Sequence, residues 1–263
     1  MKKSNFAKFM HKFAVVLSCA FLVTPAVQCE CTTTKSAAMQ DVKKEKLIVD
    51  CAFSVGHDCA CAMWLRKYNL RYQSSPLDWM YDYSLSTVAH LFETGFKDFF
   101  KQVKVDKNRT FNNHVYVYDT KNHIESRHHY DKDAPFKKEK VRVDKIMANR
   151  AKKVMEIMKK SNSIALISHR EEPYRDFIKF IERMGKVYPD KKIYLINVRH
   201  GKSHNISSKV VYKKDNLEVI DYTFFNKDNS LPWYGNPKGW KEVMESLQLR
   251  EKHNIPKSLS FHD

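Results

Sequence analysis

Cysteine is absent from the chain after residue 61, which excludes a disulfide framework for the C-terminal part. The six cysteines lie at positions 19, 29, 31, 51, 59 and 61. Structural zinc usually binds pairs of the form C-x2-4-C, whereas only one residue separates Cys59 from Cys61 and no second pair follows. His57, His128 and His129 are the histidines that could complete such a site. We therefore expect no metal and no cofactor.

Nucleic-acid-binding motifs are also missing, although the chain is strongly basic. It has 47 Lys and Arg residues against 30 Asp and Glu, a net charge of +17 and a pI near 9.5. Such a balance favours contact with nucleic acid, anionic lipid or anionic glycan. No RNP pattern, paired Cys/His finger or basic heptad array occurs, and acidic residues are interleaved with the basic ones. We expect no specific nucleic-acid partner and keep an anionic surface as a possible one.

A hydrophobic run long enough for a comfortable membrane span is lacking as well. The longest candidate, FAVVLSCAFLV, is short, follows the basic MKKSNFAKFMHK and precedes the small residues of TPAVQC. This order is typical of a secretory signal peptide, here residues 1–26 with cleavage after Ala26, and predicts export to the periplasm or the outside of the cell. Neither VLSC nor AVQC is a good lipid-attachment site, so a lipoprotein is the lesser alternative. Residues 27–45 read as a linker and 251–263 as a flexible tail.

Hydrophobic periodicity predicts one α/β domain over residues 46–250. Strands are expected at 46–54, 114–119, 124–130, 164–168, 192–198, 210–214 and 217–224. Helices are expected after Asp58, after Ser84, over 141–160, over 173–188 and after the Gly-Asn-Pro turn at 235–237. The strand-helix-strand order over 164–198 predicts a parallel pair, and hence a mixed, partly parallel sheet with a Rossmann-like β-α-β unit.

Reactive side chains follow three of these strands, and the carboxyl ends of parallel strands share one edge of a sheet. Segments 54–59, 168–170 and 197–200 bring a thiol, histidines, an arginine and an amide toward that edge. Cys59 stands at a helix N-terminus, where the helix dipole favours the thiolate and lowers the thiol pKa. A thiolate paired with a histidine is the nucleophile of acyl transfer. Among 12 histidines, His128 and His129 stand out because they end a predicted strand.

Several motifs together resemble a bacterial family of papain-like cysteine peptidases, most of whose members are uncharacterised. The family's S-L-G-x-x-C reads here SVGHDC (54–59), and its S-x-P-[FIL]-D-W reads SSPLDW (74–79). Its H-D-[FY] element reads His128-His129-Tyr130, with His129 where the family usually has Asp. An apolar strand ending in Arg170, an L-[IL]-x-N strand ending in Asn197 and a W-x-G-N-x-x-x-W element at 233–240 complete the resemblance.

The resemblance implies a papain-like α+β fold as the alternative to the α/β reading, and a thiol peptidase or amidase activity. It makes Cys59 the nucleophile and His128 the base. Asn197 is our choice for the third member, with Asp119 behind it. The remaining motif positions are predicted to bind substrate: Ser54, Gly56, Asp78, Trp79, Arg170, Trp233 and Asn236. Cys61 is expected to be packed in the core or joined by a disulfide to Cys51, Cys29 or Cys31.

Two other function classes stay open at this point. An α/β glycan-modifying esterase or transferase would bind substrate at the SVGHD turn, with Arg170 and the tryptophans suiting a sugar or phosphate. A non-catalytic surface-binding module would use the basic surface alone. The expected ligand is therefore a peptide, amide or glycan.

Overall fold

The computed structural model describes residues 45–227 and 233–250, which belong to one compact unit. The predicted signal peptide, nearly all of the predicted linker and the predicted tail lie outside these residues. In the part of the chain that is described, no helix is both long and apolar enough to cross a membrane.

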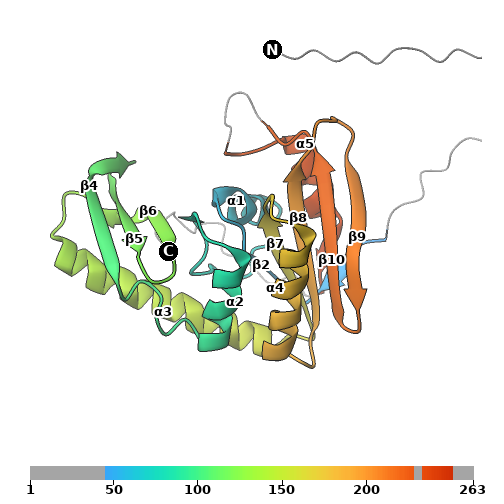
Figure 1. Ribbon diagram of the computed structural model, residues 1–263, viewed down its shortest axis with the longest axis horizontal. Coiled ribbons are helices and arrows are strands. Elements are labelled where there is room, and N and C mark those ends of the chain that lie inside the picture. Colours follow the sequence, from blue (N-terminus) through green and yellow to red (C-terminus); the bar gives the residue numbers. More distant parts are fainter. Residues whose placement is uncertain (1–44, 228–232, 251–263) are drawn as a thin grey trace, which may run out of the picture. The chain divides into compact units, whose positions relative to one another are not determined.

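A five-stranded sheet forms the centre of the unit (Figure 1). Its strand order is β2 (Cys51–Ser54), β7 (Ser163–His169), β8 (Lys192–His200), β10 (Leu217–Phe224) and β9 (Ser207–Lys214). The first four strands run parallel, and β9 pairs antiparallel with β10 at one edge. Strands β7 and β8 are nearly continuous apolar runs, as expected where both faces of a parallel sheet are covered.

Helices cover both faces of this sheet. Helix α1 (Cys59–Lys67) and helix α5 (Pro237–Glu245) pack on one face, where Ala52, Ala165 and Trp64 share a buried cluster. Helix α2 (Leu85–Thr94) and helix α4 (Tyr174–Val187) pack on the other, where Phe53 and Leu166 are buried. Successive strand residues alternate between the two clusters because side chains of a strand alternate between faces. The predicted partly parallel α/β sheet with its β7-α4-β8 unit is confirmed.

A second, antiparallel sheet has the order β3 (Met80–Tyr81), β6 (Ile124–Asp131), β5 (His114–Asp119) and β4 (Val103–Phe111). Helix α3 (Phe136–Lys160) packs against β6. Strands β4 and β5 are joined by Asn112 and Asn113, whose φ angles of 44° and 67° fit a tight two-residue hairpin turn. This sheet is also compatible with the α+β papain-like alternative.

The structure differs from the expected elements in five respects. The predicted strand 46–54 is two strands, because Asp50 interrupts it by accepting hydrogen bonds from the backbone of Asn162 and Ser163. Its first part, β1 (Leu47–Val49), pairs in parallel with the unpredicted β11 (Leu247–Leu249). Helix α3 begins five residues early, directly after Pro135, whose fixed φ suits a helix start. Strands β4 and β3 were not predicted.

Candidate active site

Cys59 is the first residue of α1, and two features of the preceding turn hold it there. The Asp58 carboxylate caps the helix by accepting a hydrogen bond from Ala60 N at 3.0 Å. At Gly56 the chain passes so close to α1 that a Cβ would lie 2.6 Å from Cys61 Sγ. Cys59 is only 4% exposed, and its side chain packs with Trp79. The turn from β2 into α1 therefore presents a largely buried thiol at a helix N-terminus.

His128, on β6, faces this thiol. Its Nε2 lies 3.6 Å from Cys59 Sγ. The hydroxyl of Tyr81, on β3, lies 2.5 Å from Cys59 Sγ and 3.1 Å from His128 Nε2, and so bridges the two groups. The Tyr81 and His128 rings stack at 5.9 Å between centroids. Because β3 pairs directly with β6, the sheet fixes both side chains against the start of α1.

Burial controls the protonation of this pair. It raises the pKa of the Cys59 thiol to about 12, and the hydrogen bond between Cys59 and Tyr81 offsets this rise only in part. Burial also lowers the pKa of His128 to about 4, with His114 and Arg127 acting in the same direction. Near neutral pH the pair is therefore a neutral thiol beside a neutral imidazole. The expectation of a lowered Cys59 pKa was wrong, because desolvation outweighs the helix N-terminus.

A cavity of about 520 Å³ opens over the pair. The residues that line it are Cys59, Trp79, Tyr81, Phe111, Asn112, His114, Arg127, His128 and Trp233. Around His128, the rings of Phe111 and Trp79 stand edge-on, with centroids at 5.0 and 6.2 Å. A thiol and an unprotonated imidazole at the base of an aromatic cavity can support attack on an acyl group and proton transfer.

A model of the family described as "Putative papain-like cysteine peptidase (DUF1796)" matches residues 50–182, just over half of the chain. The chain belongs to this family. The matched residues include Cys59, Tyr81 and His128, and end before Asn197 and Trp233. No curated protein and no solved structure matches the chain.

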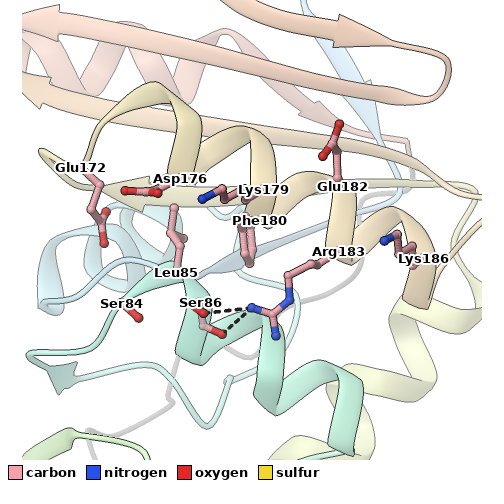
Figure 2. A pocket seen from close by; sticks show the side chains of 10 residues that line it. All are labelled: Ser84, Leu85, Ser86, Glu172, Asp176, Lys179, Phe180, Glu182, Arg183 and Lys186. Carbon is pink, nitrogen blue, oxygen red and sulfur yellow. Dashed lines mark hydrogen bonds between the residues drawn. The ribbon is translucent and has the colours of Figure 1, made fainter.

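A second cavity of about 500 Å³ in this family member lies between the start of α2 and α4 (Figure 2). Its side chains carry both signs of charge, and Arg183 donates hydrogen bonds to the backbone oxygen and the hydroxyl of Ser86. The same guanidinium pairs with Glu93. Neither cysteine nor histidine lines this cavity.

Asn197 does not join the thiol and the imidazole. Its amide lies fully buried in the five-stranded sheet, where it accepts a hydrogen bond from Ser168 Oγ at 2.7 Å and donates to Asp221 at 2.8 Å. It also donates to the backbone oxygen of Arg170. Among the hydrogen bonds of the described residues, none connects Asn197 with His128. The strand pattern placed it correctly on β8, but neighbouring strands occupy its polar atoms.

Asp119 and His129 are likewise directed elsewhere. Asp119 accepts hydrogen bonds from the backbone of Phe100 and Asn122 and so holds the turn after β5. His129, where the resemblance leads us to expect Asp, is buried and hydrogen-bonds through Nδ1 to Ser126 Oγ at 2.8 Å. Burial holds the pKa of His129 well below its usual range. Tyr81, which contacts both Cys59 and His128, is therefore the residue that best fits the role of a third group beside them.

Of the seven predicted substrate-binding residues, the structure brings Trp79 and Trp233 to the cavity. The other five do not line it. Asp78 is buried in an ion pair with Arg71 at 2.6 Å and accepts a hydrogen bond from Ser75 N. Such a buried pair holds the loop before Trp79, whose φ of 66° turns its side chain toward the thiol.

Ser54, Gly56 and Arg170 lie at the base of the turn before α1. Ser54 is buried at the end of β2. The Gly56 carbonyl accepts a hydrogen bond from the Tyr83 hydroxyl. Arg170 donates to the backbone oxygens of Val55 and Tyr83 and is itself buried. These residues support the turn that carries Cys59 rather than contact the cavity.

A polar chain connects that turn with the segment before α5. The Asp58 carboxylate lies 2.8 Å from His169 Nδ1, and His169 Nε2 lies 2.9 Å from the Asn226 side chain. Asn226 accepts a hydrogen bond from the backbone N–H of Asn236, which caps α5. Asn236 therefore acts as a helix cap and helps to hold the segment that carries Trp233.

The described cysteines, Cys51, Cys59 and Cys61, are all free. Cys61 is packed in the core, as expected. The alternative disulfide to Cys51 is absent, because the two residues are buried in clusters on opposite faces of the five-stranded sheet. Positions 29 and 31 lie outside the described residues. Within those residues, no group of three or more metal-ligating side chains could hold an ion.

Five residues at the cavity were not predicted from the sequence: Tyr81, Phe111, Asn112, His114 and Arg127. Tyr81 follows Trp79 by two residues, and only its pairing with β6 shows its closeness to His128. The others lie on or beside the β4–β5 hairpin, of which only the second strand was predicted.

Proposed function

We propose that the chain is an exported thiol hydrolase, a peptidase or amidase that attacks an amide or ester carbonyl with Cys59. The observation that carries the proposal is the 3.6 Å separation of Cys59 Sγ and His128 Nε2 at the base of the aromatic cavity. Membership of the papain-like family supports the same reaction class.

In the proposed reaction, the Cys59 sulfur forms a bond to the carbonyl carbon while its proton moves to His128 Nε2. The lowered pKa of His128 keeps the imidazole unprotonated at neutral pH, so that Nε2 is available to accept the proton, while the same shift makes it a weaker base. The tetrahedral adduct collapses to a thioester as His128 returns the proton to the leaving amine or alcohol. Water then attacks the thioester, again with His128 as base, and releases the acid and the thiol.

Tyr81 would carry the proton between sulfur and imidazole. Its hydroxyl can accept a hydrogen bond from the thiol at 2.5 Å and donate one to His128 Nε2 at 3.1 Å. With burial keeping the phenol pKa far above its usual value, Tyr81 remains a neutral phenol that keeps a proton to donate to His128 Nε2. The backbone N–H of Cys59, at the first helical position, has no intrahelical acceptor and is suited to hold the developing oxyanion.

The test is turnover of a mixed library of peptide amides and esters by wild type, Cys59→Ala and His128→Ala, with Cys61→Ala as the matched cysteine control. We expect loss of turnover in the first two variants and its retention in Cys61→Ala. Turnover that survives Cys59→Ala would exclude the thiol mechanism and favour the esterase or transferase alternative at another group. Salt-sensitive binding to anionic polymer, unchanged in all variants and without any turnover, would favour a surface-binding module.

Export rests on the basic-apolar-small pattern of residues 1–26. We expect the mature protein to be recovered outside the cytoplasm with its N-terminus at Val27. Recovery of the full chain from the cytoplasm alone would contradict export without touching the thiol mechanism.

A further inference from the structure

The cavity above Cys59 is walled by rings rather than by charges. Six of its nine lining residues carry aromatic or imidazole rings: Trp79, Tyr81, Phe111, His114, His128 and Trp233. None of the nine is Asp or Glu. Arg127 is the lining cation, and carboxylates outside the cavity already compensate its charge: it hydrogen-bonds Glu125 and lies 3.5 Å from Asp82. Its guanidinium also covers the Tyr81 ring at 3.9 Å.

One wall is Phe111, at the tip of the β4–β5 hairpin. Phe111 pairs with His114 across the tight Asn112-Asn113 turn, which fixes its direction over His128. Its side chain is nevertheless 41% exposed. A large apolar side chain held in this way at a cavity mouth, rather than packed in the core, is typical of a binding surface.

Another wall residue, Trp233, is linked to the helix of the nucleophile through its neighbour in the chain. Its neighbour Tyr234 packs on Trp64 of α1 at 4.5 Å between ring centroids and accepts a hydrogen bond from Trp64 Nε1 at 2.8 Å. Lys67 of the same helix donates a hydrogen bond to the Tyr234 hydroxyl. Trp233 itself remains 45% exposed. Both exposed rings are thus positioned relative to Cys59 by rigid elements.

We propose that this cavity is the specificity pocket of the enzyme, and that it takes a large apolar side chain, aromatic above all, next to the scissile carbonyl. The inference rests on the proposed thiol hydrolase function. Ring walls bury an apolar side chain and stack on an aromatic one. Lysine or arginine is disfavoured, since no carboxylate lines the pocket to pair with its charge. A sugar can stack on the same rings, and it is therefore the competing ligand in the test.

Binding can be measured without turnover in the Cys59→Ala variant. The probes are N-acetyl-alanyl-Xaa amides with Xaa as Phe, Leu, Lys or Gly, titrated by calorimetry, with a neutral disaccharide as the competing chemistry. We expect the Phe peptide to bind about 30-fold more tightly than the Gly peptide, as burial of one aromatic side chain allows, with Leu between them. The Lys peptide should bind no better than the Gly peptide.

The walls provide the matched variants. In the Cys59→Ala background, Phe111→Ala and Trp233→Ala should each weaken binding of the Phe peptide about 5- to 10-fold and leave the Gly peptide within about twofold. Val210→Ala, which truncates a 53% exposed side chain on β9 outside the cavity, should change neither. Circular dichroism of each variant confirms folding, and Phe111→Leu keeps an apolar wall with a smaller loss.

Equal binding of all four peptides, tighter binding of the Lys peptide, preference for the disaccharide, or no binding at all would overturn the pocket assignment. Turnover by wild type separates this failure from failure of the proposed function. If wild type cleaves amides without preferring Phe, the proposed thiol hydrolase function stands and the pocket assignment fails. If the Phe peptide binds in a way that depends on the wall residues but wild type cleaves no amide or ester, the site for an aromatic side chain stands and the proposed hydrolase function fails.

Discussion

The protonation state of Cys59 provides a sharp prediction, because the structure and the usual papain-like expectation differ. A papain-like pair is expected to rest as thiolate and imidazolium. Here a thiol pKa of about 12 and an imidazole pKa of about 4 require both groups to be neutral. At about pH 7, roughly one Cys59 in 10⁵ would be thiolate, against a few per cent for an ordinary cysteine.

Thiolate can be measured directly by its ultraviolet absorbance, as the difference between wild type and Cys59→Ala over a pH titration. This subtraction removes the other cysteines, of which Cys51 and Cys61 also have raised pKa values through burial. We expect no absorbance step assigned to Cys59 between about pH 4 and pH 9. Removal of the neighbouring ring in His128→Ala lets water reach the sulfur and should lower the thiol pKa toward its ordinary value.

A thiolate band already present at about pH 6, absent in Cys59→Ala and lost in His128→Ala, would refute this reasoning. It would mean that the helix N-terminus and the imidazolium outweigh the desolvation of the buried sulfur. Cys61→Ala serves as the control, since it should leave the difference titration unchanged.

Three further predictions concern single side chains. Tyr81→Phe removes the bridge between sulfur and imidazole and should lower kcat about 10- to 100-fold with a smaller change in KM, measured by steady-state kinetics on the best library substrate. Gly56→Ala places a Cβ within 2.6 Å of Cys61 Sγ and should lower the free energy of unfolding by about 1–3 kcal/mol, measured by denaturant unfolding. Adding Cys61→Ala to the same chain removes the clashing sulfur and should restore that free energy. If it is not restored, the clash with Cys61 is not the cause. Because the pKa of His128 is lowered in the folded protein, the unfolded chain binds the proton at a higher pH than the folded one. The contribution of His128 to the free energy of unfolding is therefore complete above about pH 6.5 and is lost as pH falls toward about 4. Its replacement in His128→Asn should reduce the acid-induced loss of unfolding free energy by at most about 3 kcal/mol, and an unchanged loss would contradict a buried neutral imidazole.

The parts of the fold that could be predicted are those with a strong local pattern. Strands β7 and β8 are short apolar runs on either side of an amphipathic helix, and Asp58 stands where a helix cap is favoured. Strand β4 was missed because most of its side chains are polar and exposed, so its extended conformation comes from pairing with β5 rather than from burial. Strand β3 is two residues long and exists through its pairing with β6.

The site residues were likewise predictable only where a local sequence feature marks them. Cys59 was marked by its place at a helix start, and the family resemblance selected His128 from two strand-end histidines. The structure brings the two side chains within 3.6 Å of each other. Asn197 was chosen because it ends a strand, but strand position does not reveal that Ser168 and Asp221 occupy its amide. The raised thiol pKa could not be predicted either, since the burial comes from residues distant in the chain that cover Cys59, His128 among them.

The most direct test of the central claim is to trap the acyl-enzyme. Wild type is mixed with an N-acetyl-phenylalanine ester, quenched with acid after a short interval and mapped by peptide mass spectrometry. The account predicts one acyl group, carried by the peptide containing Cys59, retained in Cys61→Ala and strongly reduced in His128→Ala. Hydrolysis of the ester that persists in Cys59→Ala, or an acyl group found on another residue, would contradict Cys59 as the nucleophile.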